Sequence, residues 1–187
     1  GEAVVFDGNR KTINVTVDQF NGLFLPKNDS VSITVKNLIV NINDSEGILT
    51  TAEGSGIIIT NTYTPNINNY NLTITDCAVT GNFNIGSYAG AILGRTNYRD
   101  SNSSNCDING CYTSGNIAGT DSGGIVGWDC GSVGVFSLTN CYSTGTISGS
   151  GAGGITGAYF GYKNSASITI SNCYSTGAIT GNDVGGI

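Results

Sequence analysis

The sequence predicts an all-β protein, a right-handed parallel β-helix (a solenoid) with about three short strands in each coil of roughly 30 residues. The first observation is a string, Asn-Cys-Tyr-Ser-Thr-Gly, that starts at Asn140 and again at Asn172 and is followed each time by Gly-Gly-Ile. Looser copies start at Asp76 and Gly110, and the cysteines of the four copies lie 34, 30 and 32 residues apart. Self-similarity at such a period is typical of stacked coils.

The composition supports the same fold class. The chain of 187 residues contains 29 glycines, 23 asparagines and 40 serines and threonines, but only 2 prolines. These residue types favour tight turns and strands over helix, and no segment shows the apolar period of an amphipathic helix. Isoleucine, valine, leucine and aromatic residues recur regularly, so we expect one domain with one continuous core.

Residues 1–29 are predicted to form an N-terminal cap or the first coils of the stack. The apolar run Ala3–Phe6 leads into a turn. After it, Ile13, Val15 and Val17 alternate with polar residues. This period of two is typical of a half-buried strand.

Residues 30–187 are predicted to form the β-helical repeats, with an inserted loop near residues 61–71. In each copy, apolar residues stand four and two positions before a corner, and polar residues lie between them. Because side chains alternate along a strand, the apolar positions face the core and the polar ones face solvent. The inward columns are Ile33, Leu72, Cys106, Phe136, Ile168 and Val35, Ile74, Ile108, Leu138, Ile170. The chain stops within a repeat, so we expect a fragment of a longer protein with an open C-terminal coil.

The corner itself holds Asn, Asp or Gly in every copy. Asn and Asp tolerate a left-handed backbone and hydrogen-bond to neighbouring groups in turns, so a corner ladder of stacked side chains is predicted. Its members are Asn37, Asp76, Asn140 and Asn172. The next position points inward and forms a predicted core ladder of cysteines, namely Cys77, Cys111, Cys141 and Cys173. Tyrosine follows and points outward, and the remaining Ser-Thr-Gly is predicted to be a turn.

Two further strands complete each coil in this prediction. The first buries one apolar residue per coil: Phe83, Ile117, Ile147 and Ile179. The second is a Gly-Gly-Ile strand that buries Ile92, Ile125, Ile155 and Ile187. Loops of variable sequence follow this strand, and they carry further aromatic residues.

The charge pattern excludes several functions. The net charge is −6 and the seven basic residues are scattered, whereas nucleic-acid binding requires clustered Lys and Arg. No apolar run approaches the roughly 18 residues of a membrane helix, so no membrane insertion is expected within this segment.

The chain has no histidine, and its acidic residues lie mostly in turns. Asp76 and Asp107 could fall on adjacent coils, but one is a corner residue and the other lies in a solvent-facing column. No catalytic residue, cofactor or metal site is predicted.

The six cysteines leave two alternatives open. Adjacent coils lie about 4.8 Å apart, a distance that a disulfide can span, but stacked side chains point the same way and buried thiols behave as small apolar groups. We expect a column of reduced thiols, with one disulfide somewhere as the alternative. Cys130 lies in a loop outside the columns, and it is the cysteine that we expect to be reactive or bridged.

The segment Gly123–Val133 resembles the GLUG motif of bacterial surface proteins, and the Asn-Cys-Tyr-Ser-Thr-Gly strings resemble the sequence that surrounds this motif. Similar β-helical repeats occur in adhesins of the filamentous-haemagglutinin type and in large DNA viruses. The resemblance covers most of the chain and is firm from residue 73 onward. It implies the β-helical fold and a place on a cell surface, outside the cell or on a virion. The matched residues are structural, so it implies no chemistry.

We therefore expect a non-catalytic structural or adhesive surface element that binds other protein subunits or surface glycans through its loops and an exposed aromatic face. Exposed aromatic residues can stack on sugar rings or anchor a protein partner. The candidate contacts are Tyr112, Tyr142, Tyr174, Trp128 and Tyr159. A tyrosine ladder that only shields the sheet is the structural alternative. Two other functions stay open: a carbohydrate-active β-helix of the polysaccharide lyase or hydrolase type, and a pure assembly component of a capsid or filament.

Overall fold

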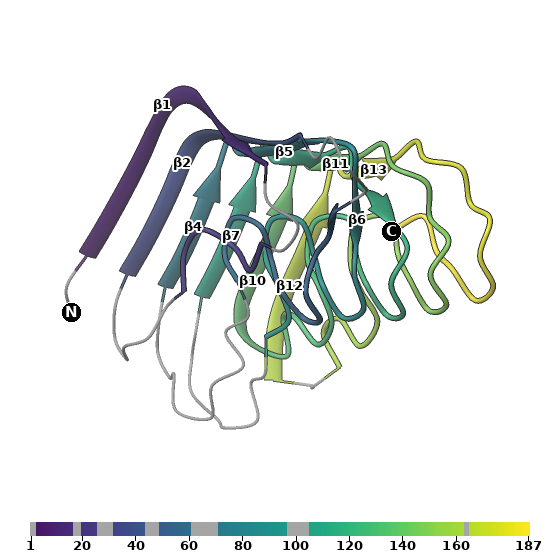
Figure 1. Ribbon diagram of the computed structural model, residues 1–187. Coiled ribbons are helices and arrows are strands. Elements are labelled where there is room, and N and C mark those ends of the chain that lie inside the picture. Colours follow the sequence, from purple (N-terminus) through teal and green to yellow (C-terminus); the bar gives the residue numbers. More distant parts are fainter. Residues whose placement is uncertain are drawn as a thin grey trace.

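The computed structural model describes residues 3–16, 20–25, 32–43, 49–60, 71–96, 105–162 and 165–187. It confirms the predicted fold class, a right-handed parallel β-helix whose coils stack along one axis (Figure 1). Every strand pair in the described part of the chain is parallel. The predicted inserted loop near residues 61–71 lies outside the described residues, except for its last residue.

The first face of the helix is a sheet of six strands that lie side by side in Figure 1. In spatial order these are β1 (Ala3–Val15), β2 (Ser32–Ile42), β4 (Asn71–Thr75), β7 (Asn105–Asn109), β10 (Val133–Thr139) and β12 (Ser165–Ser171). The second halves of β1 and β2 pass the corner and begin the second face. It continues with β5 (Ala78–Gly81), β8 (Tyr112–Thr113), β11 (Tyr142–Ser143) and β13 (Tyr174–Ser175). A third face holds β3 (Leu49–Thr50), β6 (Phe83–Ile85) and β9 (Asn116–Ile117).

The register of the first face confirms both predicted inward columns. Ile33, Leu72, Cys106, Phe136 and Ile168 are successive partners across five strands. In the neighbouring column, Val35, Ile74, Ile108 and Leu138 are each 0% exposed. The polar residues between them alternate outward, because successive side chains of a strand point to opposite faces.

The predicted Gly-Gly-Ile strand is wrong in its local structure. The copies at Gly90, Gly123 and Gly153 are bends held by two isolated bridges, one at the first glycine and one three residues later, and the copy at Gly185 has the first of these bridges. The glycines allow the backbones of successive coils to approach closely there. A Cβ on Gly154 would collide with the carbonyl oxygen of Gly186 and the side chain of Ser175. The isoleucines after the glycines are nevertheless buried, as predicted, in the coils that have neighbours on both sides.

Two further corrections concern the second and third faces. Phe83 pairs with Leu49, and it is Ile85 that pairs with Ile117, so the predicted column is shifted by two residues at Phe83. The Phe83 ring instead fills the space beside Gly115. The serine after each tyrosine is part of a strand and points inward rather than belonging to a turn, because Ser143 is 0% exposed.

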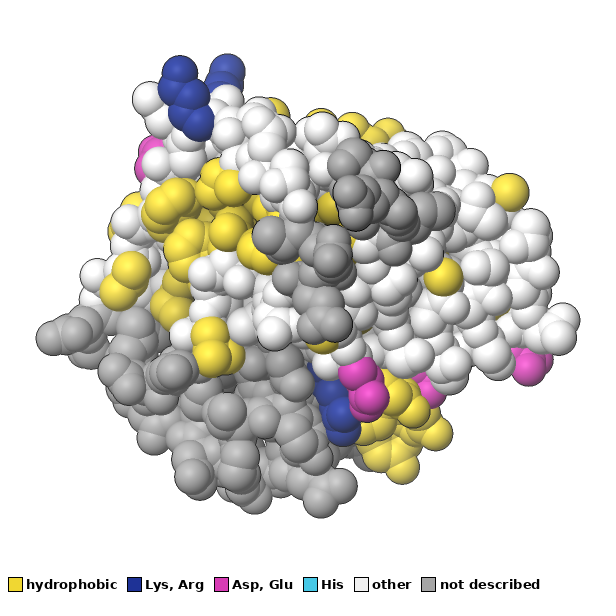
Figure 2. Space-filling model, in the orientation of Figure 1, with side chains coloured by type: hydrophobic (Ala, Val, Ile, Leu, Met, Phe, Trp, Pro, Cys, Tyr) yellow, Lys and Arg dark blue, Asp and Glu magenta, His cyan; other side chains and the backbone are white. Residues whose placement is uncertain are grey.

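The two end coils show what stacking does for burial. In β1, Val4 and Phe6 pair with the inward residues Ile33 and Val35 but are 54% and 36% exposed, and Figure 2 shows hydrophobic side chains gathered on that end of the molecule. In the last coil Ile179 is 54% exposed, whereas its column partner Ile147 is 0% exposed. The same apolar columns are therefore buried where a coil has neighbours on both sides and open where it has one. The described part of residues 1–29 continues the ladder, because β1 pairs with β2.

Replacing Gly154 by alanine should destabilise the protein by about 1–3 kcal/mol, since the added methyl group overpacks the contact with the next coil. Gly186→Ala is the matched control, because it changes the equivalent glycine of the last coil, where a Cβ would meet nothing within 4 Å. The control should stay within about 0.5 kcal/mol of the wild type. Urea unfolding followed by circular dichroism measures both. Equal destabilisation by the two variants would contradict the close approach described above.

Candidate binding surface

The corner between the first two faces positions the outward side chains of the second face. Every corner residue has a positive φ: 53° at Asn37, 51° at Asp76, 65° at Gly110, 54° at Asn140 and 53° at Asn172. This left-handed backbone is the conformation that Asn, Asp and Gly tolerate best. The composition of the predicted corner ladder thus has a direct cause in the backbone.

Hydrogen bonds between side chains link the corners of successive coils. The Asn172 amide donates to the Asn140 side-chain oxygen at 3.2 Å, and the Asn37 amide donates to the Asp7 carboxylate at 3.1 Å. Gly110 has no side chain, so the Asn140 amide donates instead to Asn109 at 2.8 Å. Among the four predicted ladder members, the bond between Asn172 and Asn140 is direct, whereas Asn37 and Asn140 also bond to Asp7 and Asn109, which lie outside the predicted ladder.

The four ladder cysteines donate hydrogen bonds to backbone carbonyls just before the corner, and the carbonyls of Asn109, Thr139 and Ser171 also accept an N–H from the neighbouring coil. Each thiol donates to the carbonyl oxygen two residues earlier, at 3.3 Å in Cys77, 3.5 Å in Cys111, 3.2 Å in Cys141 and 3.3 Å in Cys173. The first three are 0% exposed, and all six cysteines of the chain are free in the structure. Hydrogen bonds with the Cys141 and Cys77 thiols, together with burial, raise the pKa of Cys111 well above its ordinary value, and the same bonds with Cys111 lower the pKa of Cys77 and of Cys141. The column is a packing and hydrogen-bonding feature.

The expectation that Cys130 is the reactive cysteine is wrong. Its side chain is 0% exposed and its thiol donates to the Gly94 carbonyl oxygen at 3.4 Å. Burial raises the pKa of Cys130 to about 12, so the thiolate is scarce at neutral pH. Of the six cysteines, only Cys173 is not fully buried.

The three tyrosines of the repeat stack on one another along the second face. Tyr112 and Tyr142 have ring centroids 4.9 Å apart and an interplanar angle of 1°, and Tyr142 and Tyr174 lie 5.2 Å apart at 5°. Strands β8, β11 and β13 pair these residues in register. Burial within the stack raises the pKa of Tyr142, and the flanking phenols raise it further. This tyrosine ladder (Tyr112, Tyr142 and Tyr174) presents neutral phenols on a flat outward face.

The other two candidate contacts belong to a separate aromatic cluster. Trp128 packs edge-on against Tyr88 at 5.9 Å and against Tyr159 at 5.8 Å, and the Arg95 guanidinium lies 4.5 Å from its ring centroid. The Trp128 indole is therefore in contact with three side chains of the same chain. The Tyr159 side chain, in contrast, is 56% exposed. The structure thus separates the five candidate contacts into the tyrosine ladder and a cluster in which Trp128 is largely used for packing.

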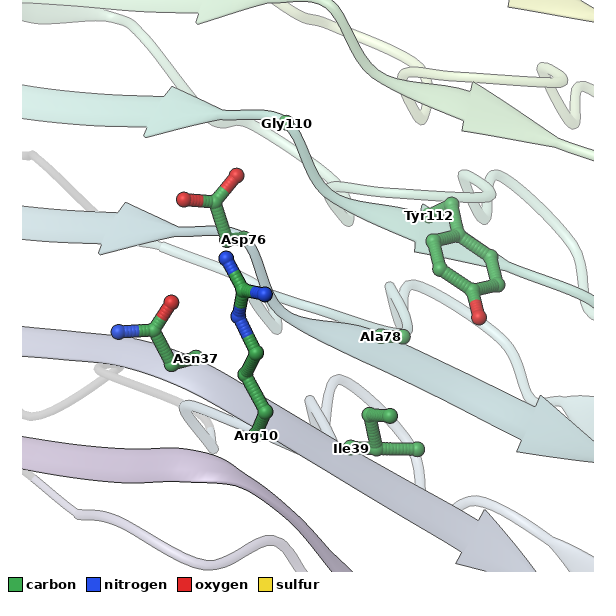
Figure 3. Close-up of a pocket in the computed structure, with 7 residues that line it drawn as sticks. All are labelled: Arg10, Asn37, Ile39, Asp76, Ala78, Gly110 and Tyr112. Carbon is green, nitrogen blue, oxygen red and sulfur yellow. The ribbon is translucent and has the colours of Figure 1, made fainter.

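A pocket of about 350 Å³ lies where the tyrosine ladder ends on its N-terminal side (Figure 3). Its lining comes from four successive coils: Arg10, Asn37, Ile39, Asp76, Ala78, Gly110 and Tyr112. Figure 3 shows the Arg10 side chain extending toward Asp76, with Asn37 beside it and Tyr112 on the far side of Ala78. Sequence analysis did not find this pocket. The signal that it missed is Ala78, which stands where the later copies of the repeat have tyrosine.

The two carboxylates that could fall on adjacent coils, Asp76 and Asp107, are not stacked on one another. Asp107 pairs with Thr73, so it lies three positions along the strand from the Asp76 corner, which is roughly 10 Å. Among the described residues, no group of three or more His, Cys, Asp or Glu side chains is arranged to hold a metal ion. Within the same residues, no helix has the length and hydropathy needed to span a membrane.

No protein-family model matches the chain, and neither does any curated protein sequence. Among solved structures, the chain is similar to a putative immunoglobulin A1 protease from Bacteroides ovatus, with a TM-score of 0.61 and 22% sequence identity. The match covers 97% of this chain and 63% of that chain, so this chain spans less than two thirds of the length of its structural neighbour. At this identity the similarity concerns the β-helical fold alone.

Alkylation of the native protein at about pH 8 should modify Cys173 first and Cys130 at least about tenfold more slowly, because the reaction requires an accessible thiolate. Peptide mass spectrometry after timed quenching measures each site, and Cys173→Ser should remove the fast phase. The denatured, unreduced protein should titrate as six thiols. Fewer than six thiols, or early labelling of Cys130, would contradict this picture.

Proposed function

We propose that this chain is a non-catalytic adhesive element, displayed on the outside of a cell or virion, that binds surface glycans through its outward aromatic face. The observation that carries the proposal is the tyrosine ladder, in which three in-register rings form one flat, neutral aromatic surface. Aromatic rings of this kind provide a large contact area with little loss of side-chain entropy.

The scaffold supports this role. Strands β8 and β11 pair with both neighbouring coils and β13 pairs with β11, above a core that is fully buried in the coils of Tyr112 and Tyr142. A ligand that contacts several rings therefore meets tyrosine side chains that are already ordered before it binds. Less free energy of binding is then lost in fixing their conformations. The resemblance of the repeats to GLUG-motif surface proteins favours the same setting.

Wild-type protein should bind some members of an array of immobilised oligosaccharides and polysaccharides. Tyr142→Ala should weaken that binding by about tenfold, since it removes the central ring of the ladder. Ser137→Ala is the matched control, because Ser137 also points outward from a strand but lies on the first face, away from the tyrosines.

The same array separates the competing functions. Release of soluble sugar over time from a bound polysaccharide would indicate the carbohydrate-active alternative. Absence of binding to every glycan, together with stable association of the chain with its own copies or another subunit, would indicate a pure assembly component. Either result would overturn the adhesive proposal.

A further inference from the structure

We infer that the pocket at the N-terminal end of the tyrosine ladder is a binding site for one pyranose ring of a glycan. The inference rests on the proposed adhesive function, and it goes further by naming the place on the surface and the groups that hold the sugar. Four observations support it. They are a missing ring in the column that holds the tyrosines, polar side chains beside this gap, a bulge in β1 that brings Arg10 to the pocket, and the chemistry of the lining residues.

The first observation is a missing ring. In the column that holds the tyrosines, the strand register places Ile39, Ala78, Tyr112 and Tyr142 on successive coils. One face of the Tyr112 ring stacks on Tyr142. Because the rings are parallel, the other face of Tyr112 looks toward the coil of Ala78, which carries a methyl group in place of a ring; the surrounding side chains leave Ala78 only 2% exposed. A flat ring seated on Tyr112 would continue the ladder's repeat of about 5 Å, within the usual range for stacked rings.

The second observation is the polar rim beside that gap. The Asp76 carboxylate extends over Gly110, and a Cβ on Gly110 would lie 2.6 Å from one of its oxygens. Glycine at this one corner therefore leaves room for the carboxylate. The Arg10 guanidinium lies beside Asp76, with Asn37 next to it, and these three side chains lie across the pocket from Tyr112 (Figure 3). A ligand in the gap thus meets a carboxylate, an amide and a guanidinium.

The third observation is the way in which Arg10 reaches the pocket. Asp7 pairs with Lys36 and Lys11 pairs with Leu38, so three residues of β1 oppose the single residue Asn37. This bulge places Arg10 at φ 57°, an uncommon conformation for a residue of this size. Bulges redirect side chains and are frequent beside binding sites. Figure 2 shows Lys and Arg side chains gathered over this bend of β1.

The chemistry of the lining selects the ligand. A pyranose has a face of C–H bonds that packs on an aromatic ring, and its hydroxyl groups donate to carboxylates and accept from guanidinium and amide groups. A phosphorylated ligand would meet the Asp76 carboxylate and a chain of net charge −6. An aromatic peptide side chain offers at most one donor to these groups, whereas a pyranose offers several hydroxyl groups. Lys36 already pairs with Asp7 at 3.3 Å, so Arg10 is the cation that faces the gap.

Saturation-transfer NMR tests the site with methyl β-D-glucopyranoside, methyl β-D-galactopyranoside and methyl α-D-mannopyranoside as probes. At least one should bind, with saturation strongest on the protons of one ring face. Ala78→Tyr should abolish binding, because the new ring completes the ladder and occupies the gap. Asp76→Asn should weaken binding at least about tenfold, since it removes a charged acceptor. Asparagine already occupies this corner in three other coils, so the backbone should be retained.

Two control variants match these changes. Ala118→Tyr adds an exposed tyrosine away from the pocket. Asp121→Asn neutralises another aspartate with a positive φ that extends over a glycine, Gly151. Both should bind the pyranosides as the wild type does, and urea midpoints of all four variants should show that each is folded.

The outcomes separate this inference from the function on which it rests. Pyranoside binding that is unchanged in both Ala78→Tyr and Asp76→Asn would overturn the pocket and leave the adhesive function standing on the remaining aromatic surface. Binding of N-acetyltryptophanamide without binding of any pyranoside would overturn it in favour of an aromatic peptide ligand. Absence of sugar binding in both this experiment and the glycan array would overturn both proposals.

Discussion

The residue-for-residue stacking of parallel coils is the constraint on which the rest of this structure depends. Backbone hydrogen bonds hold neighbouring strands about 4.8 Å apart, and the register runs without a shift through β4, β7, β10 and β12. Each side chain must therefore tolerate a copy of its own position directly above it and another directly below it. Residue choice is decided column by column rather than residue by residue.

This constraint explains the composition. Flat tyrosine rings stack at the coil spacing, small thiols fit an inward column beside the corner, and glycine occupies the bends where backbones approach closely. Like charges at this spacing would repel one another, so charged residues amount to only 11% of the chain. Where charges occur on the first face they have neutral or opposite neighbours, as Asp107 has Thr73 and Ser137, and Lys36 has Asp7 and Thr75.

The same constraint determines how much could be predicted from the sequence. Columns that repeat with fixed spacing, such as the corner at Asn140 and the tyrosines, were predictable because one copy constrains the next. Phe83 was misplaced because the third coil has two extra residues between Cys77 and the third face, including Gly81 at φ 107°. Since a strand has a period of two, both Phe83 and Ile85 still face inward, and the hydrophobic pattern does not reveal the shift. The burial of Cys130 was missed because the turn that holds it recurs at Tyr159 to Gly161 in backbone conformation but not in sequence, with phenylalanine in the place of the cysteine.

A site that binds a ligand at one position along the stack is expected where the columns of identical residues are interrupted. A column of identical residues offers the same contacts on every coil, so a ligand has no reason to prefer one position along the stack. The pocket combines three departures from the repeat: Ala78 opens the tyrosine column, Gly110 makes room for the Asp76 carboxylate, and the bulge in β1 brings Arg10 across the corner. Each departure removes or redirects one side chain, and together they produce one distinct pocket at the end of a uniform aromatic strip. The regular coils provide the rigidity, and the irregular ones determine what is bound and where.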